Sequence, residues 1–259
     1  MDVPVPATAR GRPGPVPPPA DAACLFLDVD GTLVDFAPTP DEVRVDAELV
    51  DLLRAIELRT GGALALVSGR SIAELDRLFA PLSLPAAGVH GFERRDAQGA
   101  FHRQSLLDEH LLPARNALAQ VVAAHAGLLL EDKGAALALH YRRAPQLETE
   151  ARTALVRLLD SLLPEYELLE GDAVLEIKPA SHSKASAIEA FLREPPFAGR
   201  IPVFIGDDLG DFDGFVAVRK QHGMGIAVGD RVAADWRLAD PAAVRAWLRS
   251  TFVGPDAKA

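Results

Sequence analysis

Two aspartates stand directly after a short apolar run, at a spacing that suits joint chemistry. The run is residues 24–27, and Asp28-Val29-Asp30-Gly31-Thr32 comes next. Such a run is typical of a buried parallel strand, and open α/β sheets bind ligands at the carboxyl ends of their strands. Asp28 and Asp30 are one strand period apart, so their side chains share a face. We therefore expect the two to serve one site, where Asp28 is suited to act as a nucleophile and Asp30 as general acid and then base.

Three further groups are suited to binding a phosphate. Ser68 and Gly69 follow the apolar residues 63–67, and Lys184 stands at the start of an expected helix. A hydroxyl and a close backbone N–H can bind a phosphate oxygen, and an ammonium can pair with the phosphate and with Asp28. Each group is common in solvated turns, but their order along the chain favours one phosphate site.

A second pair of carboxylates indicates a metal. Asp207 and Asp208 follow the apolar residues 201–205 and offer the oxygen ligands that Mg²⁺ prefers. Several carboxylates at one sheet edge would repel one another without a cation. We predict a Mg²⁺ site formed by Asp28, Asp30, Asp207 and Asp208; for the last two, a capping turn without metal would also account for the spacing.

The elements that position these groups fall into three stretches. Residues 21–98 contain apolar strands at 24–27, 63–67 and 86–89 and helices at 45–56 and 71–79, with a capping-box spacing at Thr39-Pro40-Asp41-Glu42 that predicts the start of the first helix. Residues 180–252 continue with helices at 184–192 and 241–250 and strands at 201–205 and 224–228. This alternation predicts a parallel sheet covered by helices.

The middle stretch, residues 99–179, has a different pattern. We expect helices at 113–126 and 146–163 and strands at 128–131, 135–142, 166–170 and 174–178. The alternation within 135–142 predicts a half-solvated antiparallel sheet. The stretch is therefore a smaller α+β unit inserted into an α/β core.

Composition limits the range of partners. The 259 residues carry a net charge of −10 and one cysteine, Cys24, which the apolar strand would bury as a core thiol. The negative charge argues against a nucleic-acid or anionic-membrane surface. No apolar run reaches the roughly 18 residues that span a membrane. We expect a cytoplasmic monomer, a disordered proline-rich tail at residues 1–20 and a short tail at 253–259.

The order Asp28, Ser68, Lys184, Asp207 resembles the four motifs of the haloacid dehalogenase superfamily. The resemblance implies a Rossmann-like parallel-sheet core with an inserted cap domain, and a Mg²⁺-dependent phosphatase that forms an aspartyl-phosphate on Asp28. It also implies that Ser68 and Lys184 stabilise the phosphoryl oxygens and that the Asp30 carbonyl helps to bind the metal.

Four further segments resemble trehalose-6-phosphate phosphatases: Leu130-Glu131-Asp132-Lys133-Gly134, Leu139-His140-Tyr141-Arg142, Leu175-Glu176-Ile177-Lys178-Pro179 and residues 202–209. The resemblance covers residues 24–250 and implies a phosphosugar substrate, with a trehalose-phosphate synthase as a possible pathway partner. It implies that six residues bind the substrate: Gly69, Arg70, Glu131, Lys133, Arg142 and Glu176. His90 and Glu93 also resemble a motif beside the active site.

Two segments depart from the pattern of that family. Gly210-Asp211-Phe212 stands where Thr-Asp-Glu is common, and Ala185 replaces the usual glycine after the motif lysine. We expect these changes to tune metal affinity or rate, with Asp213 as a possible substitute acid. Because of these changes, a non-catalytic sugar-phosphate sensor stays open as an alternative function. A same-fold phosphatase for sucrose phosphate or mannosylglycerate phosphate also stays open, as does a phosphosugar mutase.

Overall fold

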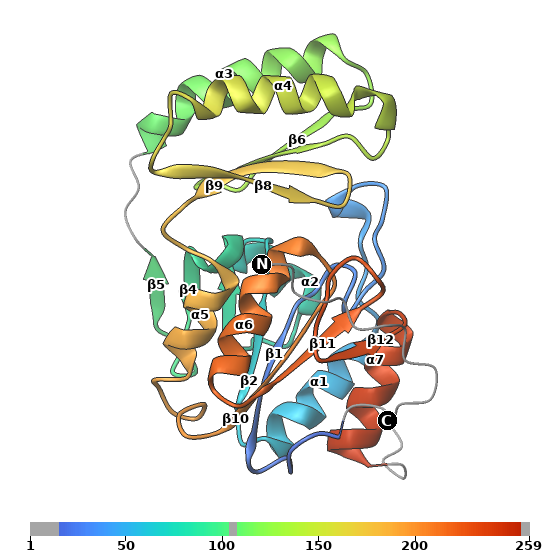
Figure 1. Ribbon diagram of the computed structural model, residues 1–259. Coiled ribbons are helices and arrows are strands. Elements are labelled where there is room, and N and C mark those ends of the chain that lie inside the picture. The colour runs from blue at the N-terminus through green and yellow to red at the C-terminus, as the bar shows by residue number, and fades with distance from the viewer. Residues whose placement is uncertain (1–15, 104–107, 255–259) are drawn as a thin grey trace, which may run out of the picture.

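A mixed eight-stranded sheet forms the larger of two domains. The structure is a computed structural model that describes residues 16–103 and 108–254. The strand order is β12-β11-β10-β1-β2-β3-β4-β5, and all neighbouring strands are parallel except the pairs β3–β4 and β4–β5, which are antiparallel (Figure 1). These strands are β1 (Ala23–Leu27), β2 (Leu64–Val67), β3 (Ala86–Gly88), β4 (Glu93–Arg95), β5 (Phe101–Arg103), β10 (Ile201–Gly206), β11 (Met224–Val228) and β12 (Trp236–Leu238).

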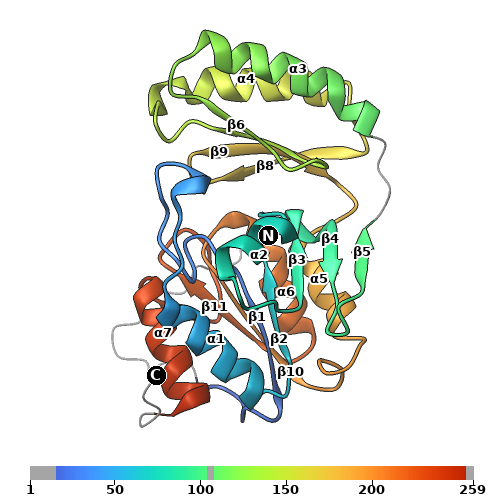
Figure 2. The same ribbon diagram turned by 180° about the vertical axis from the view of Figure 1, so that it is seen from behind.

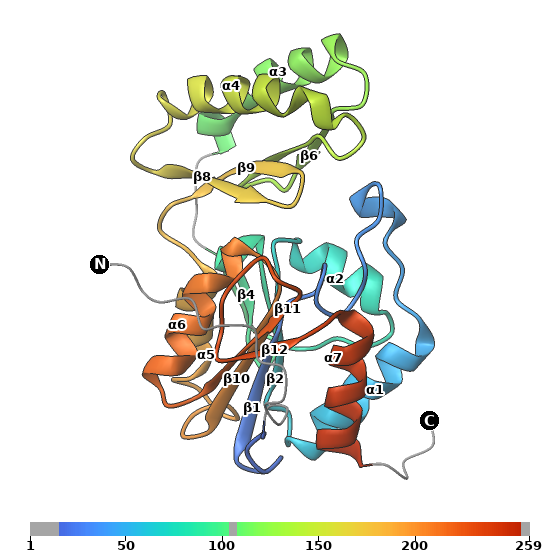
Figure 3. The ribbon, with the colours of Figure 1, turned by 45° about the vertical axis from the view of Figure 1, so that its right-hand side comes forward.

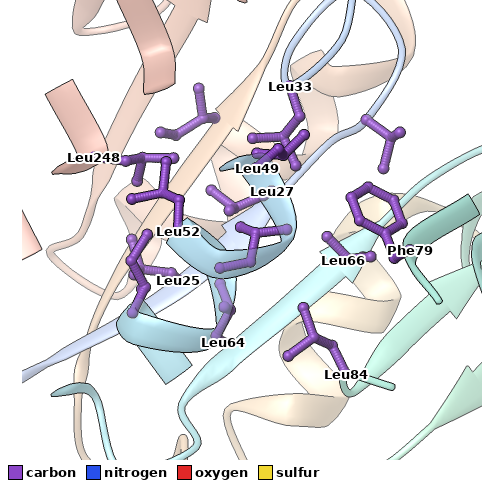
Figure 4. Close-up of a cluster of buried hydrophobic side chains, with 14 of the residues drawn as sticks. Leu25, Leu27, Leu33, Leu49, Leu52, Leu64, Leu66, Phe79, Leu84 and Leu248 are labelled. Atoms are coloured by element: carbon purple, nitrogen blue, oxygen red, sulfur yellow. The ribbon is translucent and has the colours of Figure 1, made fainter. Parts of the chain in front are cut away.

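Helices cover both faces of this sheet. The helices α1 (Ala47–Arg59), α2 (Ile72–Phe79) and α7 (Pro241–Leu248) pack on the face that receives Leu25 and Leu27 (Figure 4). The helices α5 (Lys184–Phe191) and α6 (Phe212–Lys220) pack on the face that receives Phe26 (Figure 2). Because β1 is buried on both faces, it reads in the sequence as a continuous apolar run.

The smaller domain is an antiparallel sheet with helices on one face. Its strand order is β6-β7-β9-β8, from β6 (Leu129–Asp132), β7 (Leu137–His140), β8 (Tyr166–Gly171) and β9 (Val174–Pro179). The helices α3 (Asp108–Ala124) and α4 (Glu148–Leu159) lie on the outer face, and the inner face lies over the core (Figure 3). The predicted α/β core with an inserted α+β cap is therefore confirmed. Within the described ranges, no helix is long and apolar enough to cross a membrane.

The predicted solvent face of the cap sheet was wrong. Ala136 and Ala138 are fully buried, as are Leu137 and Leu139 on the opposite face. The inner face of the sheet is buried because it covers the core, while the outer face packs on α3 and α4. A small side chain on the inner face leaves room for a pocket between the two domains.

Two other predictions differ from the structure. The helix expected at Thr39 begins at Ala47, with the Asp46 side chain accepting from the Leu49 N–H. The capping-box spacing produces only a 3₁₀ turn at Pro40–Glu42, because Val43 is extended. The antiparallel strands β4 and β5, together with α6 and β12, were not predicted. Since β5 belongs to the core sheet, that sheet continues past the expected boundary at residue 98.

The expected tails lie mostly outside the described residues. Residues 1–15 and 255–259 are not described. Residues Arg249–Val253 form a π-helical turn after α7.

Candidate active site

Four of the predicted polar residues meet at the carboxyl end of the core sheet. Asp28 follows β1, Ser68 follows β2, Asp207 follows β10, and Lys184 is the first residue of α5. These three strands are neighbours in the sheet. All four residues are at least 95 % buried, and Lys184 Nζ lies 2.7 Å from Asp28 Oδ1. The structure therefore brings buried carboxylates, an ammonium and a hydroxyl to one place.

A further carboxylate, Asp211, lies at the centre of this group. Its side chain is fully buried, and Oδ1 accepts from Lys184 Nζ at 2.5 Å. Its Oδ2 accepts from the backbone N–H groups of Asp207 and Asp208 at 2.9 and 3.0 Å. Asp211 thus fixes both the lysine and the loop that presents Asp207. Sequence reasoning assigned it no site role; the signal available was its spacing of four residues from Asp207, across the 3₁₀ turn Leu209–Asp211.

The carboxylates are crowded enough to suit a cation. Oxygens of Asp28, Asp207 and Asp211 lie within 4.8 Å of one another. Burial and the neighbouring Asp211 and Asp208 raise the pKa of Asp207 to about 7. Burial also raises the pKa of Asp28, against the opposing charge of Lys184. Lys184 and Arg231, which lies 3.4 Å from Asp207 Oδ2, are the cations beside these three carboxylates. A divalent cation would relieve the remaining negative charge, and oxygen ligands of this kind fit Mg²⁺.

The side chains of Asp30 and Asp208 do not join that cluster. Both oxygens of Asp30 accept from Arg70, at 2.6 and 2.8 Å. Asp208 Oδ1 accepts from the Gly210 N–H at 2.8 Å, so this side chain caps the turn that follows it. The guanidinium of Arg70 also donates to the Pro40 carbonyl, so this residue is held beside Asp30.

The turn after β3 places a histidine against the turn that contains Ser68 and Gly69. His90 has a φ of 54°, a left-handed conformation that His, Asn and Asp adopt more often than other side chains. A Cβ on Gly69 would lie 2.8 Å from the His90 ring, so only glycine allows this approach. Glu93, whose role the sequence left open, accepts from the Ile72 N–H at the start of α2.

Charged side chains of the cap form a network that lines the same pocket as Asp28 and Ser68. Lys133 Nζ lies 2.8 Å from Glu176 Oε2, and His90 Nε2 of the core lies 3.2 Å from the same oxygen. Glu131 Oε2 lies 2.7 Å from His140 Nε2 and 4.0 Å from Lys133 Nζ. Glu131 and Glu176 both pair with the same β7 residue in register, so they flank it on one face. The side chains of this network line one pocket with the residues that end β1 and β2.

One atom of this network has no partner among the described residues. Glu176 Oε1 is buried and makes no hydrogen bond. Burial alone would raise the pKa of Glu176, but Lys133 and His90 hold that pKa well below its usual range. An ionised buried oxygen without a donor is costly, and a water molecule or a hydroxyl group could satisfy it.

The pocket also includes residues to which the sequence analysis assigned no role. His140 and Phe36 line it, and so does Asp172 from the β8–β9 turn. Arg142 was predicted to bind substrate; its Nη2 donates to Asp172 Oδ2 at 2.7 Å and to the Asp172 carbonyl at 2.8 Å. No local pattern marks Phe36 or Asp172, because their neighbours here are distant in the sequence.

Comparisons with known proteins agree with this geometry. The family model for trehalose-phosphatase matches residues 26–242. The chain is 45% identical over 224 residues to trehalose-6-phosphate phosphatase of Escherichia coli, covering 86% of this chain and 84% of that protein. A trehalose-6-phosphate phosphatase related protein of known structure has a TM-score of 0.73 at 25% identity, over 87% of this chain and 95% of that one. The C-terminal domain of the C. albicans trehalose-6-phosphate phosphatase has a TM-score of 0.79 at 21% identity, over 90% and 92%, and shows the fold.

Proposed function

The chain belongs to the trehalose-phosphatase family and is a phosphoric monoester hydrolase, and from this premise we propose that it hydrolyses trehalose 6-phosphate to trehalose and phosphate. The observation that carries the proposal is the Glu176 carboxylate. It belongs to the cap and lines the pocket that Asp28 also lines, and its Oε1 makes no hydrogen bond with the described residues. A disaccharide phosphate carries hydroxyl donors on a second sugar ring, away from its phosphate, whereas a small phosphate ester does not.

We assign the nucleophilic role to Asp28. Its carboxylate would attack phosphorus and form an aspartyl-phosphate as the sugar oxygen leaves. Lys184, 2.7 Å from Asp28, would stabilise the charge on the phosphoryl oxygens, as would the Ser68 hydroxyl and the Gly69 N–H. Mg²⁺ bound by Asp28, Asp207 and the Asp30 carbonyl would neutralise part of the phosphoryl charge.

Asp30 is the acid–base group in this proposal. It would give a proton to the departing sugar oxygen and later take one from the water that cleaves the aspartyl-phosphate. Because Arg70 holds both Asp30 oxygens, we assign Arg70 to orienting Asp30. Its neighbour Gly69 retains the predicted role in substrate binding.

Sugar recognition is assigned to the cap. Glu131, Lys133 and Glu176 would form paired hydrogen bonds with sugar hydroxyls, since charged groups make the strongest such bonds. The substrate must be supplied by a reaction that joins two sugars and leaves one phosphorylated, which keeps a trehalose-phosphate synthase as the predicted pathway partner. The monomeric state and cytoplasmic location remain predictions.

Phosphate release from a panel of phosphosugars tests the proposal. We expect release from trehalose 6-phosphate, loss of release with EDTA and recovery with Mg²⁺. Release from sucrose phosphate or mannosylglycerate phosphate alone would contradict the proposed substrate but not the proposed mechanism. Binding without release would favour the sensor, and transfer of phosphate to a phosphorylated product would favour the mutase.

A further inference from the structure

Four side chains from the two domains meet at one end of the pocket. Phe36 and Arg231 belong to the core, and Arg142 and Asp172 belong to the cap. Asp172 Oδ2 lies 2.7 Å from Arg142 Nη2 and 2.8 Å from Arg231 Nη2. The two guanidinium carbons lie 4.8 and 5.0 Å from the centre of the Phe36 ring, within cation–π range. The cluster therefore joins the domains through one carboxylate and one aromatic ring.

The cluster lies away from the covalent connections between the domains. The chain enters the cap after β5 and returns to the core after β9, on one side of the molecule (Figures 1 and 2). The loop between β1 and α1, which contains Phe36, reaches toward the cap on the opposite side. A contact there opposes opening more effectively than one beside the connections, because it acts far from the hinge.

The guanidinium of Arg231 also lies beside one of the carboxylates at the end of the core sheet, Asp207. Arg231 Nη1 lies 3.4 Å from Asp207 Oδ2 while its Nη2 holds Asp172 of the cap. The position of the cap is therefore linked through one side chain to the loop that presents Asp207.

We propose that Phe36, Arg142, Asp172 and Arg231 form a latch that closes the cap over the bound sugar, with Asp172 and Arg231 as positioning residues for turnover. The inference rests on the proposed function for its substrate. The side chains of Arg231 and Arg142 are 39% and 31% exposed, so their ion pairs are individually weak and the latch can open to release product. The latch favours substrates large enough to need the closed cap.

The test compares two carboxylates in the same hairpin. Asp172→Asn removes the charge that crosses to the core, whereas Glu170→Gln removes one that pairs with Arg152 inside the cap. Asp172→Asn should lower kcat/KM for trehalose 6-phosphate about tenfold and that for a small aryl phosphate less than about twofold. Glu170→Gln should change neither. Arg231→Gln should lower kcat/KM for trehalose 6-phosphate at least as much as Asp172→Asn, because Arg231 also contacts Asp207.

A second readout needs no substrate. Spin labels on Glu150→Cys in α4 and Asp51→Cys in α1 report the distance between cap and core, because both positions are exposed. The native Cys24 is buried, which raises the pKa of its thiol to about 12 and keeps it from labelling. Asp172→Asn should lengthen and broaden this distance, and Glu170→Gln should not.

The two readouts separate the modes of failure. If Asp172→Asn behaves like Glu170→Gln in distance, or changes the distance without changing turnover, the latch is wrong. Equal losses for trehalose 6-phosphate and the aryl phosphate would overturn it as well. If the wild-type protein releases phosphate only from another sugar, the proposed function fails, and the distance measurement still tests the latch.

Discussion

Asp211 Oδ1 lies 2.5 Å from Lys184 Nζ, and both side chains are buried at the carboxyl end of the core sheet. The Asp211 carboxylate uses its other oxygen to accept from the backbone N–H groups of Asp207 and Asp208. The Asp211 side chain thus holds both Lys184 and the backbone at residues 207 and 208, and it need not touch the substrate to do so. The arrangement explains why a chain lacking the common Thr and Glu beside Asp211 can keep an ordered site.

We predict that Asp211→Asn destabilises the fold and the reaction together. The amide would point an N–H donor at another donor, either Lys184 or the backbone N–H groups of Asp207 and Asp208. The buried ammonium of Lys184 would also lose one of the two carboxylates that pair with it. Breaking a buried ion pair by removing one partner costs about 3 kcal/mol or more in free energy of unfolding. Urea unfolding without metal measures this, and Asp213→Asn, an exposed neighbour in α6, is the control. Equal stability of the two variants would contradict the role given to Asp211.

We predict that Asp28→Asn abolishes turnover and keeps the fold. An amide is a poor nucleophile, so kcat should fall by at least about a thousandfold. The variant still accepts a hydrogen bond from Lys184, and its thermal unfolding should remain cooperative. Phosphate release and circular dichroism check the two expectations, with the exposed Asp35→Asn as the control. Turnover within about tenfold of the wild type would remove Asp28 as the nucleophile.

We predict that Arg70→Lys lowers kcat and leaves KM nearly unchanged. The guanidinium holds both oxygens of Asp30, and an ammonium cannot reproduce that paired geometry. A less well oriented Asp30 should cost about tenfold in kcat, because it acts only in the proton-transfer steps. Steady-state kinetics separate the two constants. A rise in KM with constant kcat would instead support the substrate-binding role predicted from the sequence.

The sequence predicted residues whose neighbours follow from strand order. Asp28, Ser68 and Asp207 end adjacent strands, so a correct sheet order brings them together. Asp211 was missed because a 3₁₀ turn folds it back beneath the loop, which no periodicity reveals. The hairpin β4–β5 was missed because its short polar strands lack alternation. Long-range ion pairs accompany it, including Arg94 with Glu194 and Arg95 with Asp76.

In the cap, too, the sequence predicted the strands but not the contacts between distant residues. Its strands were predicted from alternation, but one face was assigned to solvent since alternation does not say what covers a sheet. Asp172 and Arg231 are far apart in the sequence, and their contact depends on how the two domains are placed. Contacts of this kind require the assembled fold.

We predict that Glu176 makes stability depend on acid pH. Burial would raise its pKa, but Lys133 and His90 hold the pKa well below the ordinary 4.5. A carboxylate with a depressed pKa stabilises the fold above its ordinary pKa, and this contribution is lost as the pH falls through the folded-state pKa. Glu176→Gln should therefore unfold more easily than the wild type near about pH 7, with the difference narrowing toward about pH 3. Urea unfolding across this range measures it, with the exposed Glu150→Gln as the control. A difference that stays constant with pH would contradict the charge interaction.

We predict that restoring the common family residues at the metal loop changes little. A Cβ on Gly210 would lie 3.1 Å from Asp208 Oδ1 and 3.6 Å from Leu169 Cδ2, so a threonine fits with a small adjustment. Phe212 is 51% exposed, and a glutamate there would be solvated. Removing groups that orient metal ligands usually costs about 10- to 100-fold, but here Asp211 already supplies that orientation. Gly210→Thr with Phe212→Glu should therefore change kcat by less than about threefold at saturating Mg²⁺. A gain of two orders of magnitude would mean that the native loop is impaired, and would bring the sugar-phosphate sensor to the front.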